Sequence, residues 1–137
     1  MLEIGTGSGY MAALLATHEE HVWSIEIVPE LAAMARTNLR RRGVSNVSVE
    51  TGDGVPGLPA LAPYDFIMAS GSLPLVPQEL LAQLKVGGRM FAIVGAAPAM
   101  TAQLIVREAK DAFRTVGLFE TQAAALKNAP APTRFVF

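Results

Sequence analysis

The sequence has no cysteine, few charges and no long apolar run, and each absence removes a class of protein. Without cysteine, the chain cannot form disulfides, thiolate zinc sites or a cysteine nucleophile. A net charge of −1 argues against a nucleic-acid binder that works by bulk charge. The longest apolar stretch, residues 91–100, is broken by Gly95 and Pro98 and is far shorter than the roughly 20 residues of a membrane span. We therefore expect a soluble, cytoplasmic protein that binds neither membranes nor nucleic acid.

The residues that are present describe an ordinary globular chain. It has 137 residues, of which 51% are hydrophobic and 17% are charged. This balance supplies enough apolar side chains for a core and excludes an intrinsically disordered chain. We expect residues 1–137 to form a single domain.

Strand-like and helix-like segments alternate over roughly the first 95 residues. Short apolar runs predict strands at 2–4, 22–27, 47–51, 64–69 and 89–94, and helical periodicity predicts helices at 10–18, 29–42 and 77–84. Such alternation is typical of a parallel, doubly wound α/β sheet of the Rossmann-like kind. Two further strand-like runs, 102–108 and 113–121, predict a C-terminal antiparallel hairpin, and 134–137 a final edge segment.

A glycine-rich loop follows the first predicted strand. Gly5, Gly7 and Gly9 give the pattern G-x-G-x-G before a predicted helix. Glycines here let the backbone turn tightly and approach a ligand closely, although a plain strand-to-helix turn would use them too. Dinucleotide-binding loops have their third glycine one place later, where this chain has Tyr10. The pattern therefore favours a nucleoside ligand without a pyrophosphate.

Polar side chains follow the carboxyl ends of four predicted strands. These are Glu3, Glu26, Asp53 and Ser70. Glu26 is placed where open α/β sheets bind ribose hydroxyls, and small residues around Ser70 leave room for a ligand. Taken singly, Glu26 could be a solvated carboxylate and Asp53 part of a turn. Because ligands of such sheets bind at this edge, the four together predict a binding site. No catalytic residue or metal-ligating cluster stands out.

Several motifs together resemble the protein-L-isoaspartate O-methyltransferase family, whose cofactor is S-adenosylmethionine. They are residues 2–10, Glu26, 52–54, 63–65 and 83–89, in order along nearly the whole chain. The resemblance implies a seven-stranded, mostly parallel sheet in which the last hairpin adds one antiparallel strand. It also implies methylation of the α-carboxyl group of isoaspartyl residues in damaged proteins, the first step of their repair.

The resemblance also implies which residues bind the cofactor. The glycine loop, residues 5–9, would line its methionine end, Glu26 would hold the ribose, and Asp53 with Gly54 would meet the adenine. Glu3 would organise the loop, or reach the cofactor amino group through water. The complete set of implied cofactor-binding residues is Glu3, Gly5, Thr6, Gly7, Ser8, Gly9, Glu26, Ile27, Asp53, Gly54 and Ser70.

Three features depart from the family pattern. Typical members carry a substantial region before the glycine loop, an alanine-rich stretch after the fourth strand where this chain has 70–73, and a different C-terminal strand from 134–137. We therefore expect an N-terminally truncated cofactor-binding core, with one sheet face under-covered and an apolar patch exposed on it.

Two other functions remain open at this stage. The chain could be a catalytically incomplete cofactor-binding fragment or relic, as the missing region indicates. It could also be an NAD(P)-dependent oxidoreductase, although Tyr10 and the Gly-Asp-Gly loop argue against that. The oligomeric state stays undetermined.

Overall fold

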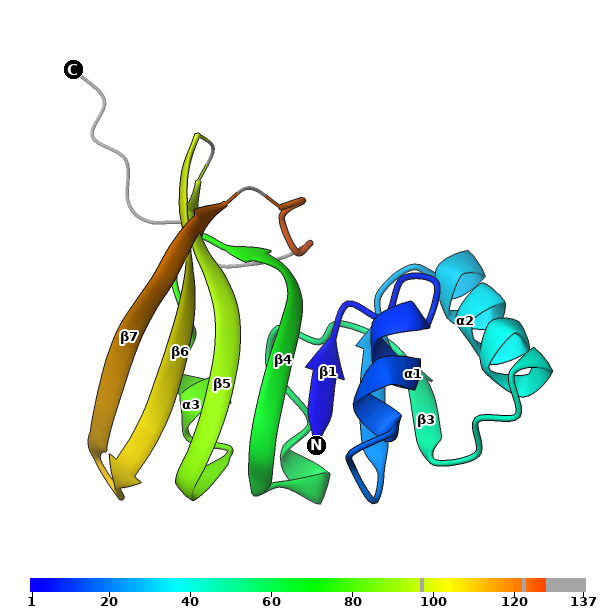
Figure 1. Cartoon of the computed structure of the whole chain (residues 1–137), viewed down its shortest axis with the longest axis horizontal. Coiled ribbons are helices and arrows are strands. Elements are labelled where there is room, and N and C mark those ends of the chain that lie inside the picture. The colour runs from blue at the N-terminus through cyan, green and yellow to red at the C-terminus, as the bar shows by residue number, and fades with distance from the viewer. Residues whose placement is uncertain (97, 122, 128–137) are drawn as a thin grey trace.

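The computed structural model describes residues 1–96, 98–121 and 123–127. The expected edge segment at 134–137 lies outside these residues. The elements run in the order β1 (Leu2–Ile4), α1 (Tyr10–Ala16), β2 (Val22–Glu26), α2 (Pro29–Arg41), β3 (Val47–Thr51), the 3₁₀ turn η1 (Pro59–Leu61), β4 (Tyr64–Leu73), α3 (Gln78–Leu81), β5 (Leu84–Ala96), β6 (Ala99–Ala109) and β7 (Ala112–Thr121). Figure 1 shows this arrangement.

The strands form one seven-stranded sheet in the order β3-β2-β1-β4-β5-β6-β7. Strands β1 to β5 pair in parallel, and β6 runs antiparallel to both β5 and β7. This confirms the expected doubly wound sheet with an antiparallel hairpin at its end. The connection from β5 to β6 is also tight, because a Cβ at Gly95 (φ +123°) would overlap the carbonyl oxygen of Ala99. That turn requires glycine.

Strands β4 and β5 extend well beyond the segments that the sequence pattern predicts. β4 continues past Ala69 to Leu73, because Ser72 and Leu73 resume pairing with β5 after a register shift. β5 already begins at Leu84, which pairs with Tyr64, so the predicted helix over 77–84 is reduced to α3. The extension of β4 continues past the carboxyl ends of its neighbouring strands, and its Ser72 pairs there with residues near the C-terminus.

Helix α2 buries only part of its predicted apolar stripe. Helical periodicity predicts a stripe of Leu31, Met34, Ala35 and Leu39, of which Ala35 and Leu39 are buried while Leu31 and Met34 are 36% and 41% exposed. The small residue Ala32 is fully buried as well. A Cβ at Gly9 would lie 3.4 Å from the Cα of Ala35, so small residues let the glycine loop and α2 pack closely.

The helices cover the sheet unevenly. In Figure 1, α1 lies in front of the sheet near β1 and β2, and α3 lies behind β5. No described helix crosses the front of β4 to β7. Half-buried Met68, Phe91 and Ile93 line a hollow on the α1 side of these strands. Within the described residues, no helix is long and apolar enough to cross a membrane.

Candidate ligand-binding site

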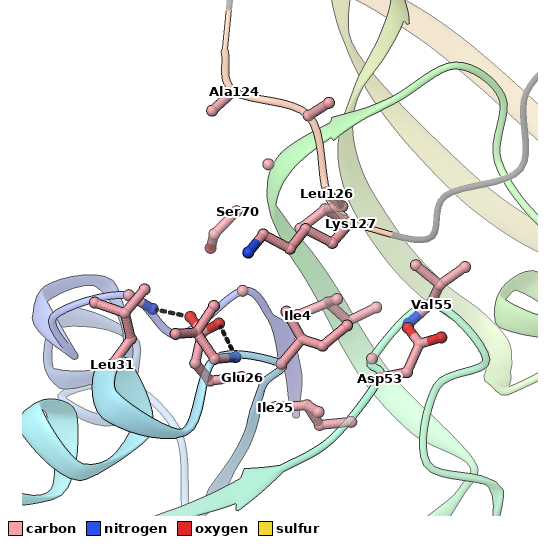
Figure 2. Close-up of a pocket in the computed structure, with 17 residues that line it drawn as sticks. Ile4, Ile25, Glu26, Leu31, Asp53, Val55, Ser70, Ala124, Leu126 and Lys127 are labelled. Carbon is pink, nitrogen blue, oxygen red and sulfur yellow. Dashed lines mark hydrogen bonds between the residues drawn. The ribbon is translucent and has the colours of Figure 1, made fainter.

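A cavity of about 260 Å³ opens at the carboxyl edge of β1, β2 and β4 (Figure 2). The chain leaves β1 toward β2 on one side and later returns to β4 on the other, which is where open α/β sheets bind ligands. The cavity is lined by Ile4, Gly5, Gly7, Ile25, Glu26, Ile27, Val28, Leu31, Asp53, Gly54, Val55, Ser70, Gly71, Ala124, Ala125, Leu126 and Lys127.

The glycine loop forms one wall of this cavity with bare backbone. Gly5 and Gly7 have φ angles of +91° and +55°, which L side chains rarely adopt. The amides of Gly5 and Thr6 both donate to the carbonyl oxygen of Ile25, at 2.8 and 3.3 Å. These bonds hold the loop against the end of β2 and leave the glycine backbone facing the cavity.

Glu26, the last residue of β2, presents a fixed carboxylate to the cavity. Its Oε1 accepts a hydrogen bond from the amide of Gly7 at 2.8 Å, and its Oε2 accepts one from the amide of Val28 at 3.0 Å (Figure 2). The side chain is only 6% exposed. An ionised carboxylate offers about four acceptor sites, so both oxygens can still accept hydrogen bonds from a ligand. Paired hydroxyl groups suit this arrangement.

The loop after β3 brings Asp53 and Gly54 to the far side of the cavity. Asp53 is exposed, and its Oδ1 accepts a hydrogen bond from the amide of Val55 at 3.0 Å, so part of its role is to shape the turn. A Cβ at Gly54 would lie 2.7 Å from Cγ2 of Ile4, so the absence of a side chain lets this loop approach β1. Ile4 and Ile25 form an apolar floor between the loop and Glu26.

Glu3 lies beneath the cavity in a buried hydrogen-bond network. Ser24 Oγ donates to its Oε1 at 2.6 Å, and Ser70 Oγ donates to its Oε2 at 2.9 Å. Thr6 Oγ1 lies 2.6 Å from Ser24 Oγ and extends the network to the glycine loop. Burial raises the pKa of Glu3 above its ordinary value of 4.5, the two serine hydrogen bonds oppose that rise, and the charge of Glu26 adds to it. Glu3 thus joins the ends of β1, β2 and β4.

The structure brings most of the sequence-predicted site residues to this cavity, namely Gly5, Gly7, Glu26, Ile27, Asp53, Gly54 and Ser70. Four others lie elsewhere. Glu3 and Thr6 point into the buried network. Ser8 lines neighbouring hollows and its carbonyl oxygen accepts a hydrogen bond from Asn38, while Gly9 packs against Ala35. These four shape the glycine loop and the network beneath it, and a role of theirs in cofactor binding stays a prediction.

Sequence reasoning missed the segment that closes the cavity from above. Residues 123–127, here called the strap, return from β7 to the extended end of β4. The amide of Ser72 donates to the carbonyl oxygen of Ala124 at 2.8 Å, and the amide of Leu126 donates to the carbonyl oxygen of Ser72 at 2.9 Å. No local pattern in an Ala-rich stretch indicates a partner more than fifty positions away. Ile25, Val28, Leu31 and Val55 were also missed as lining residues.

The groups around the cavity suit an organic ligand. Within residues 1–96, 98–121 and 123–127, no group of three or more His, Asp or Glu side chains could hold a metal ion. The fixed carboxylate, the bare glycine backbone and the apolar floor instead form a site for an organic ligand with hydroxyl groups and an apolar ring.

The sequence of this chain matches a known protein family. The model of the family "Protein-L-isoaspartate(D-aspartate) O-methyltransferase (PCMT)" matches residues 1–122. A protein-L-isoaspartate O-methyltransferase from Myxococcus xanthus is 56% identical over 95 residues, which are 69% of this chain and 45% of that protein. One from Polaromonas is 39% identical over 129 residues, covering 94% of this chain and 55% of that protein. The chain spans about half the length of the curated relatives it matches.

Solved structures agree with the sequence comparison. A protein-L-isoaspartate O-methyltransferase structure superposes with a TM-score of 0.82 at 30% identity, covering 90% of this chain and 40% of that one. A Plasmodium falciparum protein in complex with S-adenosyl-L-homocysteine has a TM-score of 0.77 at 20% identity, covering 92% of this chain and 64% of that one. The second likeness supports the fold alone.

Proposed function

The chain belongs to the protein-L-isoaspartate O-methyltransferase family, and on that premise we propose that it binds S-adenosylmethionine in the carboxyl-edge cavity and methylates isoaspartyl carboxylates. One observation carries the proposal. The carboxylate of Glu26 is fixed by two backbone amides at the edge of a cavity that also has bare glycine backbone and an apolar floor. That donor and acceptor set fits an adenosine with its two ribose hydroxyls.

Different lining residues would contact different parts of the cofactor. Glu26 would accept hydrogen bonds from the ribose hydroxyls, while Asp53 and the backbone of Gly54 would meet the adenine. Gly5 and Gly7 would pass along the methionine portion without steric obstruction. Leu31 is exposed on α2 yet lines the cavity, so it would contribute apolar contact to the bound nucleoside. When bound there, S-adenosylmethionine would supply an electrophilic methyl group.

The protein's task in this reaction is to position the acceptor and exclude water. A carboxyl group has an ordinary pKa of about 4, so the acceptor is already an ionised nucleophile at neutral pH and needs no general base. Among the described lining residues, none is a histidine, which suits a reaction of this kind. Holding the two reactants together in the right orientation can lower the activation free energy by up to roughly 7–11 kcal/mol.

The proposal also covers the domain that acts, the cell compartment and the methyl acceptors. We propose that residues 1–137 act as a single cofactor-binding domain. The proposed acceptors are isoaspartyl residues in damaged cytoplasmic proteins, whose methylation begins their repair. The family membership supports this setting.

A methyl-transfer assay tests the proposal. The chain is incubated with methyl-labelled S-adenosylmethionine and a peptide that contains one isoaspartyl residue, with the matched aspartyl peptide as control. We expect a base-labile methyl ester on the isoaspartyl peptide only. Binding of S-adenosylhomocysteine without transfer would favour an incomplete cofactor-binding unit, and absence of both would contradict the proposal.

A further inference from the structure

The strap places a cation over a cavity that otherwise presents carboxylates. Among the described lining residues, Lys127 is the only one with a cationic side chain, whereas Glu26 and Asp53 are acidic. Figure 2 shows the Lys127 side chain extending into the cavity, with its nitrogen on the side of Ser70 and Glu26. The ion pairs found in the described part of the chain join Met1 to Asp65 and Arg114 to Glu108, so Lys127 has no carboxylate partner there.

The position of Lys127 follows from how the strap is attached. Two backbone hydrogen bonds, one made by Ala124 and one by Leu126, join the strap to Ser72 just before Lys127. Leu126 packs against the hydrophobic core, and its Cδ2 would lie 2.8 Å from a Cβ at Gly71 and 3.1 Å from one at Gly5. The glycines at these positions therefore leave the space that Leu126 occupies. With Leu126 fixed, the next residue must project near the cavity mouth.

We propose that Lys127 is a carboxylate-recognising residue of this site. The inference rests on the proposed function, because that reaction brings two carboxylates to the cavity: the amino-acid carboxylate of the cofactor and the carboxylate of the acceptor. An ammonium group without a carboxylate partner, held at the mouth of an otherwise acidic cavity, suits an anionic group of the incoming ligand.

The test compares three variants: Lys127→Met, Lys127→Arg and, as matched control, Lys110→Met in the turn between β6 and β7. Calorimetry measures S-adenosylhomocysteine and 5′-methylthioadenosine, which lacks the amino-acid carboxylate. Fluorescence anisotropy measures a labelled isoaspartyl peptide binding to the chain saturated with S-adenosylhomocysteine. Lys127 is exposed, so its replacement should leave the thermal midpoint of unfolding unchanged.

Each source of the carboxylate gives its own result. Contact with the cofactor predicts that Lys127→Met weakens S-adenosylhomocysteine binding roughly tenfold, leaves 5′-methylthioadenosine unchanged, and is rescued by Lys127→Arg. Contact with the acceptor predicts unchanged nucleoside binding and a peptide affinity weaker by roughly tenfold.

The inference and the proposed function fail in different ways. Wild-type levels of nucleoside and peptide binding by Lys127→Met would overturn the role of Lys127 while the proposed function stands. The role of Lys127 would also be overturned if the unmodified chain bound no peptide and the Lys127→Met variant bound S-adenosylhomocysteine as tightly as the unmodified chain does. No binding of either nucleoside by the unmodified chain would overturn both.

Discussion

At the scale of single residues, the site depends on how two glutamates are held. Sequence reasoning placed Glu26 at the end of its strand, because an apolar run followed by a carboxylate is a local pattern. It could not show that Gly7 and Val28 each donate an amide to a different carboxylate oxygen, since that depends on how the glycine loop folds back. The same limit applies to Glu3: its expected part in organising the loop is a pattern inference, but the serine hydrogen bonds that connect it to β2, β4 and the loop depend on partners far away in the sequence.

Replacing Glu26 by glutamine tests whether its charge and acceptor geometry matter. The amide nitrogen of Gln would face the amide of Gly7 or of Val28, so one fixed acceptor is lost along with the charge. We expect S-adenosylhomocysteine to bind at least about tenfold more weakly, as one charge-assisted hydrogen bond contributes roughly 1.5–3 kcal/mol. Calorimetry measures the loss, and Glu50→Gln on β3, where the side chain is exposed, is the matched control. Equal loss in both variants, or in neither, would contradict the assignment.

Glu3 should make stability depend on pH. Its pKa in the folded protein lies above the ordinary value of 4.5, mainly because of burial. The folded state therefore holds this proton more tightly than the unfolded state. The contribution of Glu3 is fully present below pH 4.5 and is lost as the pH rises through its folded pKa.

Urea unfolding of the wild type and of Glu3→Gln, from pH 4.5 upward, isolates this effect from the other carboxylates. We expect the free energy of unfolding of the wild type to fall relative to Glu3→Gln as the pH rises. A difference that stays constant across this range would show that Glu3 titrates alike in both states.

At the scale of elements, the loop between β3 and β4 is held by one side chain whose structural role no sequence pattern indicates. Gln83, just after α3, is 6% exposed. Its Oε1 accepts from the amide of Leu58 at 3.0 Å, and its Nε2 donates to the carbonyl oxygens of Pro56 and Glu79 at 2.8 and 3.0 Å. These bonds fix the loop that carries Asp53. A glutamine near a helix end gives no local signal of such a role.

Gln83→Leu should therefore destabilise the protein. It leaves three backbone groups without their partner, and we expect a cost of about 2–4 kcal/mol in the free energy of unfolding, measured by urea denaturation. Gln78→Leu, at an exposed position of α3, should cost little. Similar values for the two variants would show that water replaces the hydrogen bonds of Gln83.

Local patterns predicted most elements, and the failures have a common cause. The parallel strands and the β6–β7 hairpin follow from short apolar runs and turn residues that act within a few positions. The extension of β4 and the strap depend on partners far away in the sequence. Ser72 pairs with both Ile93 and the strap. Such contacts leave no periodic trace.

At the scale of the whole molecule, the two faces of the sheet differ. The core around Leu80 and Leu84 is well buried, while the front of β4 to β7 has half-buried apolar side chains and no described helix over it. The hollow there is lined by Met68, Phe91 and Ile93 beside the exposed Tyr10. An apolar surface of this kind favours association.

We expect the 137-residue chain to self-associate through this face. Analytical ultracentrifugation should show a mass that rises with protein concentration, because association removes apolar surface from water. Met68→Glu should shift the equilibrium toward monomer, whereas Val86→Glu, at a 64% exposed position in another part of the sheet, should not. A monomer at every concentration would contradict this prediction.

The central claim is that the carboxyl edge of the sheet binds the nucleoside cofactor. Two-dimensional amide NMR of the labelled chain, titrated with S-adenosylhomocysteine, tests it most directly because it reports both binding and place. We predict saturable one-to-one shifts at the amides of Gly5, Gly7, Ile27 and Gly54, with Gly87 and Gly117, which do not line the cavity, unchanged. No shifts in a folded chain at millimolar ligand, or shifts confined to another surface, would contradict it.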